Sequence, residues 1–307
     1  MLSGRHTRLM SIVNSRDDYL CIGGKRLALN DLVDRRLFDA DYVQSLRAEM
    51  HSAQPFQHLV IDGAFHPFLL ELASKEFETL DSGGWRLSGG EQHLLRRSVV
   101  GAKMGPALQL YFGLINSGWF LEFLSSVSGV HQLIADSTLH NGGLHETGAG
   151  GSFGIHRDFD RHPKLGLHNE IGVITYLNKD WDASWQGALE LWDSGKKQCV
   201  GRIEPEFGRC VVIRHSSVSF HGHPAPLKSP DWMARRSLAS YYYGNRVDDD
   251  AQEPYSTYLF SREVKSIKHT MKLWTPPIVW NLVQRIGSNY RRAAKTRTHL
   301  RSNDVES

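Results

Sequence analysis

A segment near the middle of the chain, GIHRDFDRHPKLGLH at 154–168, contains several side chains that could bind a metal ion. They are His156, Asp158, His162 and His168, with Asp160 as a further carboxylate. In an extended strand, residues i and i+2 point to the same face, so His156 and Asp158 can reach one ion while Arg157 points away. An HxD pair is common by chance, and a metal site requires a third ligand from elsewhere in the chain.

A third candidate ligand lies further along the sequence, in the segment SFHGHP. His221 of this segment follows an apolar, strand-like run, RCVVIRH. Two imidazoles and one carboxylate on one side of a metal form the facial triad of non-haem Fe(II) oxygenases. The competing interpretation is that His221 is a loop histidine among the 16 histidines of the chain. On the HxD pair and the late histidine alone, the loop interpretation would be preferred.

A pattern suited to carboxylate binding favours the metal site. The run RRSLASYYY at 235–243 reads as a strand with Arg235 and Ser237 on one face. A guanidinium binds a carboxylate through two parallel hydrogen bonds, and a nearby hydroxyl can add another. Arg235 is therefore an expected anchor for a dicarboxylate such as 2-oxoglutarate. Arg236 is expected on the opposite face as a surface or interface charge, although a one-residue bulge would exchange the two arginines.

The strands needed to carry these residues lie in the second half of the chain. Short runs rich in β-branched and aromatic residues alternate there with Gly, Pro, Asp and Ser. The runs are HQLIADSTL, SFGIHRD, EIGVITYL, GALELWD, RCVVIRH and RRSLASYYY, with a shorter one at VGRIEP. Short strands without helices between them indicate an antiparallel sandwich or barrel rather than a βαβ fold. We expect a mainly β fold with flanking helices, a double-stranded β-helix barrel of the jelly-roll or cupin type.

Helical patterns dominate the first half of the chain. Apolar residues recur at helical spacing within 29–53, 66–80 and 107–127, and HLVIDGAF reads as a short buried strand. The chain has 307 residues, of which 40% are hydrophobic, and this suits one main domain with terminal additions. The expected parts are a helical N-terminal extension at 1–54, the barrel domain with its supporting helices at 55–245, and a helical C-terminal extension with a basic tail at 246–307.

Charge and cysteine usage limit the partners and the compartment. The formal net charge of +3 is small for this length, so the overall field does not call for nucleic acid or an anionic membrane. The three cysteines lack CxxC spacing, which argues against a zinc ribbon and a disulfide framework and favours a reducing compartment. No run approaches the roughly 18 apolar residues of a membrane span, and no signal peptide is recognisable. We expect a cytoplasmic protein without nucleic-acid or membrane partners.

The sequence around the candidate ligands resembles the prolyl-4-hydroxylase-like branch of the Fe(II)- and 2-oxoglutarate-dependent dioxygenases. The similarity rests on HRD, YLNKDW, a GGxLxLW-type segment, the IEPxF turn and RRSLASYYY, and it covers roughly residues 130–245. GGLHETGAGG and TPPIVWNL are similar to segments of an uncharacterised bacterial subgroup of that family. The resemblance implies a jelly-roll oxygenase.

The resemblance also implies roles for individual residues. The iron ligands would be His156, Asp158 and His221. Arg235 would pair with the C5 carboxylate of 2-oxoglutarate, Tyr176 would donate its hydroxyl to the same carboxylate, and Ser237 would assist. Where the family often has a further tyrosine this chain has His145, whose imidazole could donate instead. The interval from His221 to Arg235 is longer than usual, with PAPLKSPDW as the inserted loop.

The implied cofactors are Fe(II), 2-oxoglutarate as co-substrate and O2, with ascorbate supporting activity. The implied reaction hydroxylates an unactivated C–H bond of an amino acid, a peptidyl group or a natural-product or saccharide-type substrate, and releases succinate and CO2. Desaturation, demethylation or cyclisation would use the same cofactor chemistry. A non-catalytic metal-binding sensor or a zinc hydrolase would also accept the triad, but neither explains Arg235. The terminal extensions are expected to cover the barrel mouth or to form a homodimer contact.

The other polar residues near the triad are expected to bind no metal. Asp160, His162 and His168 lack the spacing of a further ligand, and we expect solvated loop residues at the rim of the site. His223 is expected to be structural or to lie beside the ligands. Glu190 alternates with two leucines and should face away from them.

Overall fold

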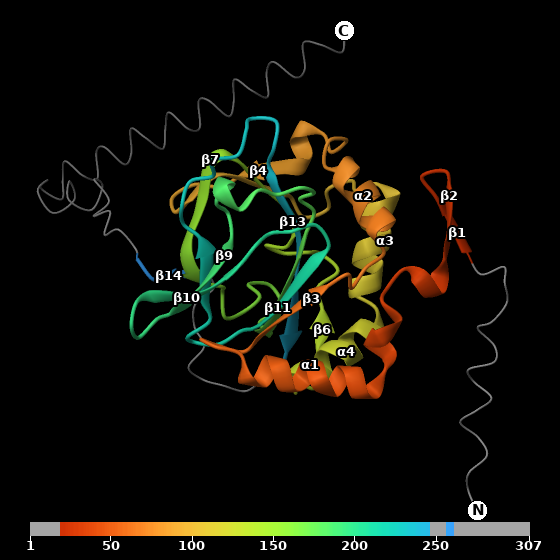
Figure 1. The fold of residues 1–307 in the computed structure, drawn as a ribbon, viewed down its shortest axis with the longest axis horizontal. Coiled ribbons are helices and arrows are strands. Elements are labelled where there is room, and N and C mark those ends of the chain that lie inside the picture. The colour runs from red at the N-terminus through yellow and green to blue at the C-terminus, as the bar shows by residue number, and fades with distance from the viewer. Residues whose placement is uncertain (1–18, 246–255, 261–307) are drawn as a thin grey trace, which may run out of the picture. The chain divides into compact units, whose positions relative to one another are not determined.

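The computed structural model describes residues 19–245 and 256–260, which combine a curled antiparallel sheet with α-helices (Figure 1). The helices are α1 (Ala40–Ser52), α2 (Pro67–Glu76), α3 (Pro106–Ile115) and α4 (Gly118–Ser128). The first strands are β1 (Tyr19–Ile22), β2 (Lys25–Ala28), β3 (His58–Asp62), β4 (Trp85–Leu87), β5 (Gln92–Ser98) and β6 (Ile134–Ala135). The later strands are β7 (Gly143–Arg157), β8 (His168–Tyr176), β9 (Leu189–Asp193), β10 (Gln198–Ile203), β11 (Arg209–Arg214), β12 (Phe220–His223), β13 (Arg235–Gly244) and β14 (Thr257–Tyr258).

Twelve of the strands join in a single sheet. Its main path runs β10-β9-β12-β7-β13-β8-β11-β3, and neighbours along it pair antiparallel. The long strand β7 also pairs with β5 and β14, so the sheet folds over around it. Sequence neighbours are seldom sheet neighbours, which is the crossing connectivity of a jelly-roll. The predicted mainly β fold with flanking helices is confirmed.

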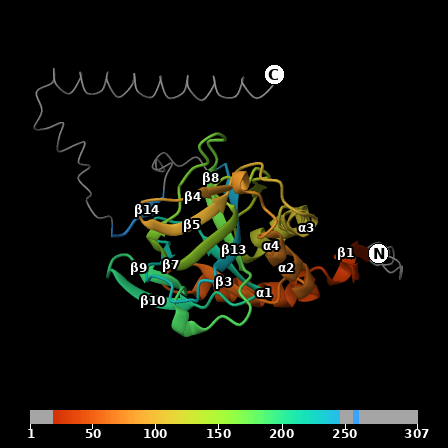
Figure 2. The ribbon, with the colours of Figure 1, turned by 90° about the horizontal axis from the view of Figure 1, so that it is seen from above.

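The helices lie together beside the sheet in both views (Figures 1 and 2). Alternate residues of β11 explain how one strand serves two layers. Val212 packs in the larger core, which includes Leu108 of α3 and Leu124 of α4, whereas Val211 packs in a smaller core with Leu189 and other residues of the curled sheet. Because successive side chains of a strand point to opposite faces, the sheet presents one face to the helices and the other to its own interior.

Local side-chain contacts fix where the helices begin. Asp39 accepts a hydrogen bond from Tyr42 N at 2.8 Å, which caps α1. Glu76 caps α3 from a distance, because its two carboxylate oxygens each lie 2.9 Å from a backbone N–H of Ala107 and Leu108. A Cβ on Gly105, the residue before α3, would lie 2.3 Å from the Glu76 carboxylate carbon, so glycine is needed for this approach.

Several sequence predictions need correction. The helix predicted at 107–127 is two helices, because the chain breaks at Asn116 and Ser117 between α3 and α4. The strand predicted at HQLIADSTL is mostly wrong, since only β6 is extended there. Asp136 instead folds the following residues into a turn by accepting hydrogen bonds from Thr138 N and His140 N. The strand at VGRIEP exists as part of β10.

The predicted extensions at 1–54 and 246–307 are only partly within the described residues. Residues 19–54 contain the hairpin of β1 and β2 as well as α1, and Leu46 and Met50 of α1 pack in the larger core. The basic tail lies outside the described residues, and the proposed domain boundaries stay a prediction. None of the helices in the described ranges has the length and apolar character that a bilayer crossing requires.

Candidate active site

The two candidate histidine ligands lie opposite each other on neighbouring strands. β12 pairs with β7 so that His221 is the direct partner of His156, and Asp158 follows the end of β7. His156 Nε2 lies 3.4 Å from Asp158 Oδ1, and His221 Nε2 lies 3.7 Å from Asp158 Oδ2. The three candidate ligand atoms all lie within 4.8 Å of one another. Residues far apart in the sequence are thereby brought around one point.

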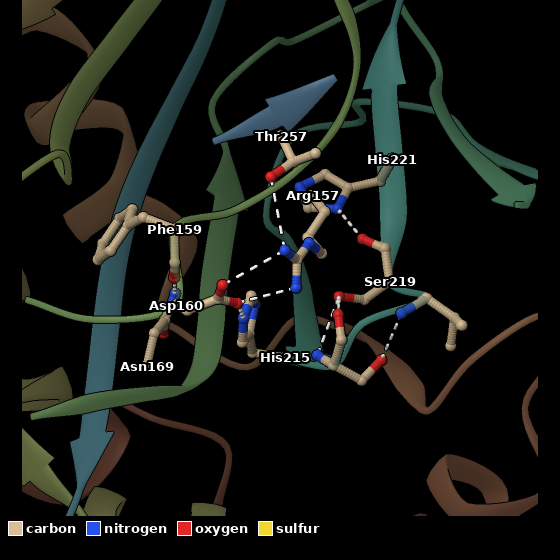
Figure 3. Close-up of polar contacts among 10 residues, drawn as sticks. Arg157, Phe159, Asp160, Asn169, His215, Ser219, His221 and Thr257 are labelled. Carbon is tan, nitrogen blue, oxygen red and sulfur yellow. Dashed lines mark hydrogen bonds and ion pairs between the residues drawn. The ribbon is translucent and has the colours of Figure 1, made fainter. Parts of the chain in front are cut away.

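Backbone carbonyls orient both imidazoles. His156 Nδ1 lies 2.8 Å from the carbonyl oxygen of Gly154. His221 Nδ1 lies 3.0 Å from the carbonyl oxygen of Ser219 (Figure 3). A carbonyl oxygen only accepts hydrogen bonds, so each Nδ1 carries the proton and each Nε2 keeps a free lone pair. This tautomer, fixed by a partner behind the ring, is the one that metal-binding histidines use.

The charges around the three side chains also suit a divalent cation. Burial raises the pKa of Asp158, but its interactions with the neighbouring imidazoles of His156 and His221 outweigh this effect and hold the pKa below its ordinary value. Burial lowers the pKa of His221 to about 4, against the opposing charge of Asp158. At neutral pH the site therefore offers a carboxylate and a neutral imidazole, the forms that bind metals. Tyr241 Oη donates to Asp158 Oδ1 at 3.3 Å.

Arg235 and Tyr176 line the same pocket as the three candidate ligands. Ser237 of β13 pairs with Tyr176 of β8, and this register places Arg235 beside the tyrosine ring, with its guanidinium carbon 4.9 Å from the ring centroid. Arg235 Nε donates to the carbonyl oxygen of Gly187 at 2.7 Å. Among the residues that the structure describes, no carboxylate forms an ion pair with Arg235, which is only 6% exposed. A buried guanidinium with only neutral partners retains its positive charge for an anionic ligand.

Arg236, the next residue of β13, points to the opposite face, as expected. Its Nε lies 2.9 Å from Glu146 Oε2, and Arg96 of β5 contacts the other oxygen of the same carboxylate. Glu190 likewise faces away from the leucines beside it and accepts a hydrogen bond from Trp192 Nε1 at 2.9 Å. The alternation of each strand therefore separates the pocket from the outer ion pairs.

His145 lies on β7 directly opposite Ser237 and lines the pocket. Burial, and next the charge of Arg97, lower the pKa of His145 to about 3, so the imidazole is neutral at pH 7. Its Nε2 lies 3.1 Å from the carbonyl oxygen of Asn141 and carries the proton. The other nitrogen is then an acceptor, so this geometry does not offer a carboxylate the donor that the resemblance suggested.

The expectation that Asp160, His162 and His168 are solvated is wrong. The three residues are 7%, 2% and 2% exposed, respectively. His162 Nδ1 accepts hydrogen bonds from the backbone N–H groups of Lys164 and Leu165, so the imidazole closes the turn from inside. A polar turn is buried here because its side chains replace the hydrogen bonds that water would otherwise supply.

Sequence reasoning missed a polar cluster behind the candidate ligands (Figure 3). Asp160 Oδ1 lies 2.8 Å from His215 Nε2 and 2.9 Å from Arg157 Nη1. His215 follows the end of β11, and Arg157 lies between His156 and Asp158. The cluster thus braces the segment that carries two of the candidate ligands. The run DFDRHP contains the carboxylate of Asp160, but no local pattern predicts that its partner is His215, far along the chain.

His223 is buried and lines the pocket beside His221. Its Nε2 lies 3.5 Å from Thr147 Oγ1, and burial holds its pKa well below the ordinary value. The register of β12 against β7 shifts between His221 and His223, so the two histidines are not placed in the same way relative to β7. His223 is not among the three residues whose ligand atoms converge.

The curled antiparallel sheet has the jelly-roll connectivity, and it brings two histidines and a carboxylate together as a candidate metal site. Residues 142–243 match the model of the 2OG-Fe(II) oxygenase superfamily. The match covers this part of the chain, and it confirms the predicted enzyme class, a 2-oxoglutarate-dependent oxygenase, with its cofactors Fe(II) and 2-oxoglutarate. No curated protein matches the sequence.

Solved structures share the fold at low sequence identity. A Trichoplax adhaerens prolyl hydroxylase, in complex with a hypoxia inducible factor peptide fragment, aligns with a TM-score of 0.50 and 13% identity over 70% of this chain and 95% of that chain. A Burkholderia pseudomallei oxidoreductase of the 2OG-Fe(II) oxygenase family aligns with a TM-score of 0.49 and 12% identity over 70% and 94% of the two chains. The first of these alignments supports the double-stranded β-helix fold.

Proposed function

We propose that the protein is a dioxygenase that hydroxylates a C–H bond of a small-molecule or peptidyl substrate. One oxygen atom of O2 would enter the substrate and the other would enter 2-oxoglutarate, which is converted to succinate and CO2. The observation that carries the proposal is the presence of two features in one pocket. The three candidate metal ligands converge there, and Arg235 lies beside them as a buried guanidinium with neutral partners.

In this proposal His156, Asp158 and His221 hold Fe(II). The donor set fits, because it combines two imidazole nitrogens with one carboxylate and leaves one side of the ion open. The carbonyl groups of Gly154 and Ser219 keep both Nε2 atoms turned toward the ion. Bound Fe(II), together with 2-oxoglutarate and O2, supplies the oxidation of the C–H bond.

Arg235 and Tyr176 bind the far carboxylate of 2-oxoglutarate in the same proposal. The guanidinium offers its remaining N–H groups and the phenol its O–H, and Ser237 adds a hydroxyl from the same face of β13. Apolar side chains such as Val173, Leu189 and Ile213 line the rest of the pocket. They exclude water, which strengthens the ion pair and limits unproductive oxidation. A metal sensor or a zinc hydrolase would have no use for this anchor.

The test is succinate formation by the purified protein with Fe(II), ascorbate and 2-oxoglutarate, measured by mass spectrometry with panels of amino acids, peptides and natural-product extracts. We expect succinate from the wild-type protein and none above background from Asp158→Ala. Oxygen incorporation from 18O2 into one product would show hydroxylation. Equal succinate from the wild type and Asp158→Ala in every panel would contradict the proposal.

A further inference from the structure

A second hollow opens on the other side of Asp158 and Tyr241. It shares His145, Phe153, Asp158 and Tyr241 with the pocket that is lined by Arg235 and Tyr176, here named the co-substrate pocket. The hollow therefore borders the proposed iron position. Its other walls come from the hairpin of β4 and β5, from the loop at 140–141 and from β14. The hollow is thus the space from which a substrate would face the iron.

Two arginines line this hollow, Arg86 on β4 and Arg97 on β5. They are direct partners in the antiparallel pairing, so their side chains lie on the same face of the hairpin. Like charges directly opposite each other destabilise a sheet. The sequence therefore carries an unfavourable pair at this position, where a neutral side chain on either strand would remove the repulsion.

The polar contacts of Arg97 within the described ranges are all with neutral groups. Its Nη2 lies 2.6 Å from Gln92 Oε1 and its Nε lies 3.3 Å from Ser88 Oγ. Burial, together with the charge of Arg86, lowers the pKa of Arg97, and the charge of Asp158 is among the effects that oppose this. Arg86 is exposed at the rim, and it too forms no ion pair with any residue in the part of the chain that the structure describes.

Arg96, the neighbour of Arg97 on β5, forms an ion pair with a carboxylate. Its Nε and Nη2 lie 2.8 Å and 2.7 Å from Glu146 Oε1, on the opposite face of β5. Arg96 has a carboxylate as its partner, whereas Arg97 contacts only neutral groups, although both are arginines of the same strand. Arg86 and Arg97 both line the hollow without an ion pair to a described residue, and Asp158, the carboxylate in its lining, is a candidate iron ligand. Aromatic rings of Phe153, Phe159 and Tyr258 form other parts of the wall.

We propose that this hollow is the substrate site and that Arg97, with Arg86 at the rim, binds an anionic group of the substrate, either a carboxylate or a phosphate. This inference rests on the proposed function, because it treats the iron side of the hollow as the place of reaction. A guanidinium matches both anions through two parallel hydrogen bonds. The anion would supply the negative charge that the Arg86 and Arg97 pair lacks, and the aromatic walls would contact the rest of the substrate.

The experiment compares matched anionic and neutral probes. Phenyl phosphate is compared with phenol, and phenylacetate with phenylacetamide. Binding is measured by titration calorimetry to the protein loaded with Mn(II) and saturating 2-oxoglutarate, so that no turnover occurs. We expect at least one anion to bind roughly tenfold tighter than its neutral partner. The pair that shows the larger preference identifies phosphate or carboxylate as the recognised group.

The variants are Arg97→Gln and the matched control Arg96→Gln, which removes the same charge from the opposite face of the same strand. Arg97→Gln should lose the preference for the anion and Arg96→Gln should keep it. Equal affinity of anion and neutral partner for the wild type, no binding of either anion at about 10 mM, or a preference that survives Arg97→Gln would each overturn the inference.

Substrate-independent conversion of 2-oxoglutarate to succinate separates this inference from the proposed function. Arg96→Gln should retain that basal turnover with Fe(II), because Arg96 lines neither the co-substrate pocket nor the second hollow and pairs with Glu146 instead. A wild-type protein that binds the anions but never forms succinate would contradict the dioxygenase proposal alone. A protein that forms succinate but shows no anion preference would contradict the substrate inference alone.

Discussion

Arg235 and Tyr176 meet in the pocket that also contains the three candidate metal ligands, with 3.2 Å between Arg235 Nη2 and Tyr176 Oη. They come from the neighbouring strands β13 and β8, and the tyrosine is fully buried. The contact holds the guanidinium beside the phenol, so that both groups can reach one carboxylate.

Arg235→Lys is expected to raise the Kd for 2-oxoglutarate roughly tenfold to a hundredfold, because a lysine cannot reproduce the bidentate contact. Tyr176→Phe should raise it by roughly threefold to tenfold, the effect of one neutral hydrogen bond. Calorimetry with the Mn(II)-loaded protein measures both. Arg236→Lys, on the opposite face of β13, is the control and should leave the Kd unchanged. An unchanged Kd for Arg235→Lys would show that the anchor lies elsewhere.

Metal content distinguishes the candidate ligands from the other buried histidines. His156→Ala, Asp158→Ala and His221→Ala should each lose bound Fe(II) or Mn(II), measured by inductively coupled plasma mass spectrometry after desalting. His162→Ala and His223→Ala should retain about one ion per chain, since neither imidazole converges with the three ligand atoms. Loss of the ion in His162→Ala, in a variant that remains folded by circular dichroism, would mean that the ligand set is different.

Asp160→Ala is expected to destabilise the fold by roughly 3 kcal/mol, because it removes a buried carboxylate that contacts one half-buried and one buried side chain. The partners are Arg157 and His215. Urea unfolding of the metal-free protein measures the free energy. Asp160→Asn, which keeps the shape and one acceptor, should cost less. A free energy of unfolding for Asp160→Ala within about 0.5 kcal/mol of the wild type would contradict a bracing role.

The metal-free protein should lose stability as the pH falls from 7 toward 5. Burial lowers the pKa of His145 to about 3 and that of His223 well below its ordinary value. In the unfolded chain both titrate near pH 6.5, so below that pH the unfolded state binds more protons than the folded state and is favoured. Each such proton costs about 1.4 kcal/mol per pH unit. Urea unfolding at pH 7 and pH 5 measures the loss, which should be smaller in His145→Gln.

If His145→Gln showed the full wild-type loss between pH 7 and pH 5, His145 would not be one of the groups responsible. His145→Gln is the informative substitution because glutamine keeps a polar side chain of similar reach but has no titration in this range.

Strands with strong local patterns could be predicted from sequence. β8, β11 and β13 are rich in β-branched or aromatic residues, and their alternation separated Arg235 from Arg236 correctly. The HxD spacing likewise placed His156 and Asp158 together, because period-2 geometry is a local property of the strand. Their distance from His221 could not be predicted from local spacing, because it depends on the register of β12 against β7.

The parts that sequence did not predict depend on distant partners. The hairpin of β4 and β5 is polar and glycine-containing, so WRLSGGEQHLLRRS carries no clear strand signal, and Arg97 was missed with it. The burial of Asp160 depends on His215, 55 positions along the chain. The break between α3 and α4 lies in an apolar stretch where only Asn116, Ser117 and Gly118 mark it.

The pairing of His156 with His221 across one step of the sheet has a thermodynamic consequence. The separation of these two rings follows from the spacing of hydrogen-bonded strands. Each ring is oriented by a hydrogen bond to a backbone carbonyl of its own segment. The conformational entropy of assembling this half of the site is therefore lost when the sheet forms and not when an ion arrives. Metal exchange can then proceed as a local event on a scaffold that is already rigid.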